Sequence, residues 1–301
     1  MSSSPLTYVL VTPARNEEAF IERTLESVVK QTVRPLKWVV VSDGSTDRTD
    51  EIVSSYVRQH EWIELVRMPE RDSRNFAGKV GSFNAGYERV RHLDYRIIGS
   101  LDADISFKAD YFEYLLRKFV ENPNLGLAGT PFNEGGEVYD YRFSSTDHVS
   151  GACQLFRREC FEAIGGYVPL KGGGIDIIAV LSARVKGWGT QTFLDKTCFH
   201  HRPMGSANHG DRLRATFKLG QRAYAVGFHP LWQVSRSVYQ MTRKPYLVGG
   251  CALFCGYFWA MLRRIHRPMA PELIAFQRRD QMRRLREFFK SRSGLAGSSQ
   301  K

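Results

Sequence analysis

An apolar segment that ends in two carboxylates, residues 97–106, constrains the fold of this 301-residue chain more than any other stretch. Residues 95–101 are apolar and rich in β-branched side chains, which is typical of a buried strand in a parallel sheet. Asp102, Ala103 and Asp104 follow at once. Ligands bind beyond the carboxyl ends of strands in open α/β sheets, so these carboxylates lie where a ligand site is expected. The alternative is that one aspartate caps the next helix and the other is solvated.

Segments with strand periodicity alternate with segments of helical periodicity through the first two thirds of the chain. This rhythm predicts an α/β fold with a doubly wound, mostly parallel sheet and flanking helices. Right-handed crossovers then bring the polar segments after each strand to one edge of the sheet. The predicted strands are 8–12, 36–42, 63–68, 97–101, 125–132, 151–156 and 191–194, and the predicted helices are about 20–29, 48–59, 79–91, 107–120, 157–164 and 176–185.

The carboxylates of Asp102 and Asp104 predict a divalent cation site. Hard oxygen ligands suit Mg²⁺ or Mn²⁺, which proteins commonly share with substrate phosphates. His200 or His201 is a candidate third ligand, because the pair follows the predicted strand 191–194. A purely structural role for both histidines is the alternative.

The net positive charge of the chain comes entirely from its last third. Residues 206–301 carry 18 Lys and Arg against 4 Asp and Glu, a net charge of +14, whereas residues 1–205 carry 25 against 27, a net charge of −2. The five cysteines lack the spacing of a metal site and are odd in number, which favours free thiols in a reducing compartment. The N-terminal residues lack the basic and apolar regions of a signal peptide, so we expect a cytoplasmic location.

Several motifs occur together in the order and spacing of a known family. PARNEE, VVVSDGSTDRT, GKVGSFNAGYE and SLDADI are followed by GACQLFRRECFEAIGGY, GGGIDIIAVLSARVKGWG and HHRP. Over about residues 7–203 the chain resembles the family 2 glycosyltransferases, which have the GT-A fold. The resemblance implies an inverting enzyme that uses a nucleotide-sugar donor.

The resemblance also implies roles for particular residues. Nucleotide contacts would come from Pro13, Ala14, Arg15, Glu17, Asp43, Lys79, Asp102 and Ala103, with Lys79 near the diphosphate and Asp104 on the metal. Three of these residues have a plainer alternative role. Asp43 could be a helix cap or turn residue, Glu17 a first-turn acid, and Lys79 an exposed lysine at a helix N-terminus.

Asp176 is the expected catalytic base. It follows a glycine triplet, residues 172–174, and matches the second acid of a Glu-Asp pair that most relatives carry. Here Ile175 replaces the first acid, and we expect this loop to be exposed and to tolerate glutamate. An ionised Asp176 would accept the proton of an attacking acceptor hydroxyl. The alternative is that Asp176 only caps the helix that follows.

Residues 206–301 are expected to form a helical region that associates with a membrane, separate from a catalytic domain at 1–205. Residues 245–262 are uncharged and lie between Arg243-Lys244 and Arg263-Arg264. They are near the lower length limit for a span, and the charge asymmetry opposes a single span with the catalytic domain in the cytoplasm. A peripheral or monotopic helix on an anionic cytoplasmic surface resolves the conflict. The alternative is a helix packed on the catalytic domain.

The expected partners are a nucleotide-sugar donor, a lipid-linked or glycan acceptor, and an anionic membrane surface, but no nucleic acid. Two rival functions are a nucleotidyltransferase and a basic nucleic-acid-binding protein. The first would carry a glycine-rich triphosphate loop, which PARNEE is not. The second lacks a recognised nucleic-acid-binding module.

Overall fold

The structure, a computed structural model, describes residues 6–70, 76–134, 137–138, 145–170, 173–202 and 212–296. The chain divides into two compact units, Met1–Met204 and Gly205–Lys301, which are described separately below. Gly172 of the glycine triplet and residues 206–211 of the basic region lie outside the described residues.

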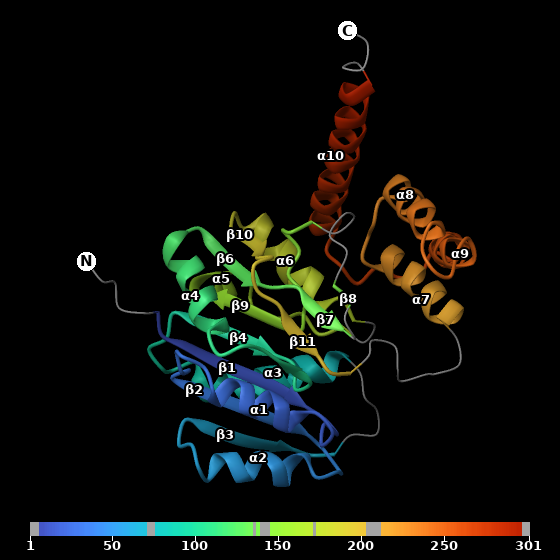
Figure 1. The fold of residues 1–301 in the computed structure, drawn as a ribbon. Helices are drawn as coiled ribbons and strands as arrows, with labels where there is room; N and C mark the ends of the chain where they lie inside the picture. Colours follow the sequence, from blue (N-terminus) through green and yellow to red (C-terminus); the bar gives the residue numbers. More distant parts are fainter. Residues whose placement is uncertain are drawn as a thin grey trace. The chain divides into compact units, whose positions relative to one another are not determined.

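A seven-stranded sheet forms the centre of the first unit (Figure 1). The strand order is β10-β6-β9-β4-β1-β2-β3, and every neighbouring pair is parallel except the two that involve β9. The predicted doubly wound, mostly parallel sheet is therefore confirmed. The strands are β1 (Tyr8–Ala14), β2 (Lys37–Asp43), β3 (Ile63–Met68), β4 (Ile97–Leu101), β6 (Leu125–Gly129), β9 (Cys153–Arg157) and β10 (Gly189–Thr192).

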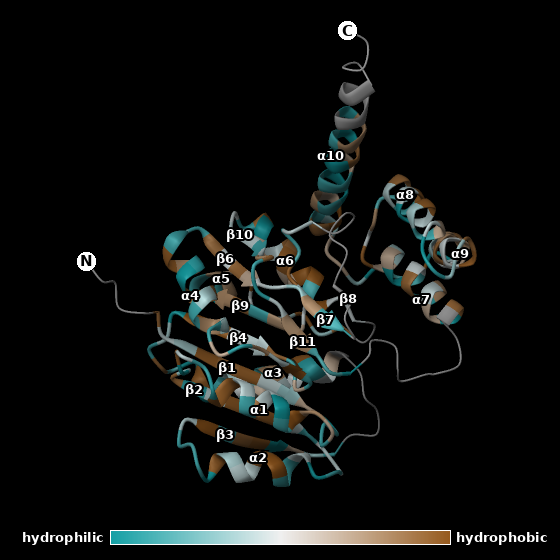
Figure 2. Cartoon of the chain, in the orientation of Figure 1, coloured by the Kyte–Doolittle hydropathy of each residue, from teal (hydrophilic) through white to brown (hydrophobic). Residues whose placement is uncertain are grey.

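Helices cover both faces of this sheet, because side chains alternate between the faces along each buried strand. Tyr8 and Leu10 of β1 pack with the apolar sides of α1, α2 and α4, whereas Val9 and Val11 pack with α3, α5 and α6. The central strands are accordingly brown in the hydropathy colouring of Figure 2. The helices are α1 (Ile21–Val29), α2 (Thr49–Val57), α3 (Phe76–Val90), α4 (Tyr111–Glu121), α5 (Arg158–Ala163) and α6 (Ile175–Val185).

A second, four-stranded sheet was not predicted from the sequence. Its order is β5-β11-β7-β8, and it joins short segments that are far apart along the chain. The predicted strand 125–132 is divided between the two sheets: its first part is β6, and its last residue begins β7. The strands of this sheet are β5 (Ile105–Ser106), β7 (Phe132–Glu134), β8 (Glu137–Val138) and β11 (Cys198–His200).

Two helix predictions need correction. The helix expected from residue 107 begins at Tyr111, because Ile105 and Ser106 form β5 first. For α6, helical spacing predicts an apolar face that includes Ile177, Val180, Leu181 and Val185. Val180 and Leu181 are buried, but Val185 is 41% exposed, and Ile178 and Ala183 are buried in place of Ile177 and Val185.

The described residues of the second unit, 212–296, form four helices. The tightest contact joins α7 and α9: a Cβ on Gly220 would collide with the Leu253 carbonyl, and one on Gly256 with the Phe217 carbonyl. No helix in the described part of the chain is both long enough and apolar enough to cross a bilayer. The helices are α7 (Arg212–Ala225), α8 (Pro230–Met241), α9 (Val248–Leu262) and α10 (Pro271–Ala296).

Candidate active site

The carboxyl ends of β1, β2 and β4 lie side by side, as the sequence predicted. Both β2 and β4 pair in parallel with β1, with Ala14 opposite Ser42 and Val11 opposite Ser100. The segments PARNEE, DGSTD and DAD therefore leave the sheet at one edge. Parallel pairing brings these three segments, which begin at residues 13, 43 and 102, to a common site.

Hydrogen bonds join the first two segments into one surface. Asn16, which has a positive φ of 53°, accepts from the Thr46 amide through its side chain at 2.9 Å. The Glu17 amide donates to the Thr49 hydroxyl at 2.8 Å. Asp43 ends β2 and is buried, while α2 begins six residues later at Thr49. Asp43 is therefore not a helix cap.

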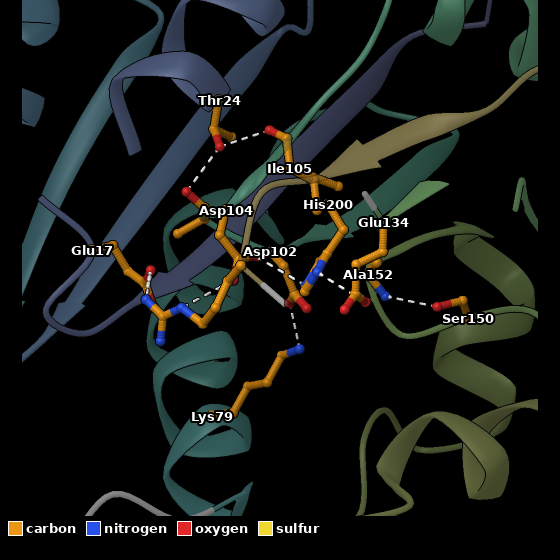
Figure 3. A network of polar contacts seen from close by, with 12 residues as sticks. Glu17, Thr24, Lys79, Asp102, Asp104, Ile105, Glu134, Ser150, Ala152 and His200 are labelled. Carbon is orange, nitrogen blue, oxygen red and sulfur yellow. Dashed lines mark hydrogen bonds and ion pairs between the residues drawn. The ribbon is translucent and has the colours of Figure 1, made fainter. Parts of the chain in front are cut away.

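The DAD segment is held from two sides. The buried Thr24 hydroxyl of α1 lies 2.8 Å from the Ala103 carbonyl and 2.7 Å from the Ile105 carbonyl. On the other side, the Asp102 amide donates to the Ala152 carbonyl at 2.9 Å. Neither aspartate caps α4, which begins only at Tyr111. The backbone contacts fix the segment and leave both carboxylates pointing into the site (Figure 3).

Asp104 lies at the centre of a charged cluster. Its Oδ1 is 3.6 Å from His200 Nε2, and its Oδ2 is 3.6 Å from Arg202 Nε. Arg202 also pairs with Glu17, which is only 4% exposed, so Glu17 is not merely a first-turn acid. The other ring nitrogen of His200 is 3.8 Å from Glu134 Oε2 of β7. Figure 3 shows these side chains converging beside Asp102.

Lys79 projects from the first turn of α3 to the Asp102 carboxylate, with which it forms an ion pair (Figure 3). Its side chain is only 25% exposed, so the alternative of a free surface lysine is wrong. Burial disfavours the ammonium charge, but Asp102 outweighs this effect and raises the pKa of Lys79, with further contributions from Asp176 and Asp104. Lys79 therefore carries a full positive charge among three carboxylates at neutral pH.

Asp176 lies in the first turn of α6, on the same side of the sheet edge. The cap of α6 is Gly174, and no side chain caps the helix, so the capping alternative for Asp176 is wrong. A Cβ on Gly151 would stand 3.2 Å from the Cβ of Asp176. Gly151 directly precedes Ala152, whose carbonyl accepts the hydrogen bond from the Asp102 amide. The Asp176 side chain therefore lies close to the DAD segment.

Ile175 is 7% exposed and packs in the core beside α3 and α5. The expectation of an exposed loop that tolerates glutamate here is therefore wrong. A carboxylate at this position would be buried against apolar side chains, which costs several kcal/mol when no partner is present.

The two histidines face different surroundings. His201 lies 2.8 Å from the Ser106 hydroxyl and 3.3 Å from an Arg23 nitrogen. Burial and the Arg23 charge lower the pKa of His201, which keeps its ring neutral at pH 7. His200 instead faces Asp104 and Glu134, and its Nδ1 is buried with no hydrogen-bond partner. Only His200 is directed at the DAD carboxylates.

The remaining nucleotide-site candidates lie where β1 ends. Ala14 is buried, and Pro13 and Arg15 are half-buried at the start of the PARNEE loop. Sequence reasoning missed Thr24 and Glu134. A threonine on the otherwise apolar side of a predicted helix was a usable signal for Thr24, because a buried hydroxyl needs a partner. Glu134 had no signal, since it reaches the site only through the second sheet.

The sequence predicted a divalent cation at this site. The side chains that could bind it are present, but those that the structure describes are not arranged as a complete set of metal ligands. Within the described ranges, no three His, Cys, Asp or Glu side chains are already close enough together to hold a metal ion. The residues nonetheless fit a cation: Asp104 Oδ1 and His200 Nε2 are 3.6 Å apart, and two adjacent ligands of one octahedral ion at about 2.1 Å stand about 3 Å apart. A small side-chain adjustment closes that difference.

Comparison with solved structures defines the class of fold. The mannosyltransferase PcManGT from Pyrobaculum calidifontis, in complex with GDP-Man and Mn²⁺, superposes with a TM-score of 0.57 at 18% identity, covering 91% of this chain and 79% of that one. Staphylococcus aureus TarS in complex with UDP-GlcNAc gives 0.55 at 13% identity, covering 87% and 74%. These likenesses identify the fold as GT-A.

The sequence profile of Glycosyl transferase family 2 matches residues 9–167, and the chain belongs to this family. The chondroitin synthase of Pasteurella multocida is 28% identical over 126 residues, 42% of this chain and 12% of that protein. The 4,4'-diaponeurosporenoate glycosyltransferase of S. aureus is 28% identical over 180 residues, 52% of this chain and 46% of that protein. The chain thus spans less than half the length of these curated relatives.

Proposed function

We propose that this protein transfers a sugar from a nucleotide diphosphate donor to an acceptor hydroxyl by a single displacement that inverts the anomeric centre. The observation that carries the proposal is the convergence of Asp102, Asp104 and Asp176 at the sheet edge of a family 2 fold. Two of these carboxylates are suited to a cation and diphosphate, and the third lies close by to receive a proton.

The donor nucleoside is assigned to the surface formed by the ends of β1 and β2. Pro13, Ala14 and Arg15 begin this surface, and the carboxylates of Glu17 and Asp43 are available to accept from base or ribose groups. The hydrogen bonds between the two loops support the assignment, because they hold the surface in shape before a donor arrives. Solved relatives bind GDP-Man and UDP-GlcNAc.

The cation, Mg²⁺ or Mn²⁺, is assigned to Asp104 and His200, with Asp102 beside them. The buried, unpartnered Nδ1 of His200 supports this choice over His201, because a metal-bound imidazole uses its second nitrogen for an outer hydrogen bond, and Glu134 is 3.8 Å away. When bound, such a cation supplies Lewis-acid stabilisation of the leaving diphosphate. A solved relative holds Mn²⁺.

Lys79 and Arg202 are assigned to the diphosphate. Each already pairs with a site carboxylate, Lys79 with Asp102 and Arg202 with Glu17. A donor that brings both phosphates and a cation offers these side chains new anionic partners while the cation satisfies the carboxylates. Lys79 and Arg202 therefore each have an anionic partner with and without the donor, so neither of the two positive charges is left uncompensated in a partly buried position.

Asp176 is assigned as the general base. An acceptor hydroxyl that loses its proton to Asp176 attacks the anomeric carbon from the side opposite the diphosphate. The bond from the anomeric carbon to the acceptor oxygen forms while the bond to the diphosphate oxygen breaks. The acceptor is a lipid-linked or glycan hydroxyl, and the enzyme acts at the cytoplasmic face of an anionic membrane.

The test replaces Asp176 by asparagine, which keeps the shape and removes the proton acceptor. We expect donor and Mn²⁺ binding at parental affinity, with transfer reduced about 10²- to 10⁴-fold. The donor is first identified by thermal stabilisation with a panel of nucleotide sugars and Mn²⁺ or Mg²⁺. The matched control is Asp94→Asn, an exposed aspartate just before β4, at the opposite end of the strands. Transfer by Asp176→Asn at the Asp94→Asn rate would remove Asp176 from the mechanism.

A further inference from the structure

Helix α9 buries its three glycines together with Leu253 and Tyr257, and it leaves several large apolar residues exposed. The buried positions include Gly249, Gly250, Gly256 and Ala260. The exposed positions recur every three or four residues, as expected for one side of a helix. They are Val248, Cys251, Phe254, Cys255, Trp259 and Leu262, which together are called the outer face of α9 here.

The buried glycines are required by close helix contacts. A Cβ on Gly256 would collide with the Phe217 carbonyl of α7, and one on Gly250 with the Ser237 carbonyl of α8. The backbones of these helices therefore approach one another directly. Helix α9 contains no charged residue (Figure 2), and of its large side chains only Leu253 and Tyr257 are buried in these contacts.

Four large apolar side chains of α9, those of Val248, Phe254, Trp259 and Leu262, are exposed, which is unfavourable in water. In water, the hydrophobic effect buries large apolar side chains and leaves polar ones outside. In lipid there is no such drive, and helices associate through small residues that let backbones approach, while large apolar residues face outwards. Trp259 is 43% exposed and Leu262 is 80% exposed, so the outer face of α9 presents substantial apolar surface to its surroundings.

The charges around this face select an anionic surface. Residues 212–270 contain ten Lys and Arg and no Asp or Glu. Arg243 and Lys244 precede α9, Arg263 and Arg264 follow it, and all four are exposed. A second copy of the chain would oppose one basic rim with another, whereas anionic lipid headgroups complement it.

The length of α9 sets how it lies. Fifteen residues extend about 22 Å, which is shorter than the roughly 30 Å hydrocarbon core of a bilayer. Basic residues at both ends stay with headgroups when the helix axis is parallel to the surface. Tyr246 and Trp259, both exposed, are residue types that concentrate at this interface.

We infer that the outer face of α9 inserts into the surface of an anionic membrane, with the helix axis in the membrane plane and the basic residues at both ends on lipid phosphates. This gives the proposed membrane partner a definite docking surface. The inference rests on the proposed membrane location and not on sugar transfer, so a failure to bind vesicles would leave the assignments in the active site unchanged.

The first experiment measures binding of the full chain to vesicles of phosphatidylcholine alone and of phosphatidylcholine with phosphatidylglycerol. We expect binding only to the anionic vesicles. Phe254→Glu with Trp259→Glu should weaken it at least about tenfold, since two large apolar side chains no longer enter lipid. Arg263→Gln and Arg264→Gln should each weaken it about fivefold. The control is Leu194→Glu, because Leu194 is an exposed apolar residue of the first unit.

The second experiment uses native thiols as depth reporters. Cys251 and Cys255 are the exposed cysteines, whereas Cys153, Cys160 and Cys198 are buried. Burial raises the pKa of all three buried thiols, to about 12 for Cys160 and Cys198, so they stay protonated and unreactive. A polarity-sensitive fluorophore on Cys255, in a Cys251→Ser background, should shift to the blue when anionic vesicles are added.

Three results would overturn the inference. Vesicle binding by Phe254→Glu with Trp259→Glu at the Leu194→Glu level would assign binding to another surface. A fluorophore at Cys255 that reports an apolar environment before vesicles are added would show that protein covers this face. Concentration-dependent dimerisation abolished by the same double variant would assign the face to a second copy. Circular dichroism and melting of each variant confirm that it is folded.

Discussion

At the scale of single residues, the carboxylates of the site are paired with positively charged side chains that lie far from them in the sequence. Arg202 lies 185 positions from Glu17 along the chain and bridges it to Asp104. Lys79 comes from a helix 23 positions before Asp102. Glu17, Asp102 and Asp104 thus each have a positively charged neighbour without a metal ion. Burial nevertheless raises the pKa of Asp102, because it outweighs the opposing effect of Lys79.

We predict that Asp104→Asn abolishes the effect of Mn²⁺ on donor affinity without unfolding the protein. Asparagine keeps the size of the side chain but loses the charge that a divalent cation needs. Isothermal titration of the donor with and without Mn²⁺ measures the effect, and Asp94→Asn serves as the control. Metal-enhanced affinity that survives in Asp104→Asn would refute the cation assignment.

At the scale of elements, the DAD segment owes its position to helix α1 as much as to strand β4. A single hydroxyl on α1 bonds two carbonyls on either side of Asp104. The Ala103 carbonyl lies just beyond the end of β4, and Ile105 lies in β5. The helix therefore positions a site to which it contributes no charge.

We predict that Thr24→Val, which preserves shape, lowers the free energy of unfolding by about 1–3 kcal/mol, because it leaves buried carbonyls without their donor. Donor affinity in the presence of Mn²⁺ should fall as well, since the segment loosens. Thr32→Val is the control, because the Thr32 hydroxyl bonds an exposed Glu113 carboxylate. Equal urea midpoints and equal donor affinities for the two variants would contradict this role.

We also predict opposite effects for two glycine substitutions in helices. Gly256→Ala should destabilise the contact between α7 and α9 by about 1–3 kcal/mol, because its Cβ meets the Phe217 carbonyl. Gly81→Ala in α3 should stabilise by about 0.4–1 kcal/mol, because a Cβ there has nothing within 4 Å. Urea unfolding gives the signs, and hydrogen exchange over residues 212–262 locates the first effect. Destabilisation of equal size in both would argue against a specific glycine contact.

At the scale of the whole molecule, charge and structure divide at nearly the same place. The compact units meet between Met204 and Gly205, and the basic excess begins there. Helix α9 packs against α7 and α8, so a cut at Pro245 would expose the surfaces that α9 covers. The boundary at residue 204 leaves both groups of helices intact.

We predict that residues 1–204 alone fold cooperatively and bind the nucleotide donor with Mn²⁺ at near the parental affinity, because every proposed donor contact lies in this unit. The same fragment should not bind anionic vesicles. Differential scanning calorimetry, donor titration and vesicle sedimentation measure these properties, with the full chain as the control. An insoluble fragment, or one without a cooperative transition, would show that the second unit is needed for folding.

Local patterns in the sequence were sufficient for the main sheet and for the edge that holds the site. Strands and helices can be predicted from the pattern of neighbouring residues. The crossover connections between parallel strands are right-handed, so PARNEE, DGSTD and DAD were expected at the same edge of the sheet. The buried side of α4, Tyr111, Phe112, Leu115, Leu116 and Phe119, followed from helical spacing for the same reason. What local periodicity could not supply was any pairing of segments far apart in the chain.

The tertiary structure alone decided the second sheet, the arrival of Glu134 beside His200, and the bridge from Arg202 to Glu17. It also determined which residues are buried at the start of α6 and in α9. Ile175 is buried where an exposed loop was expected, because it packs in the apolar core with residues of α3 and α5. In α9 the apolar run was legible in the sequence, but its exposed side was not, because the glycines at close helix contacts determine which side faces inward.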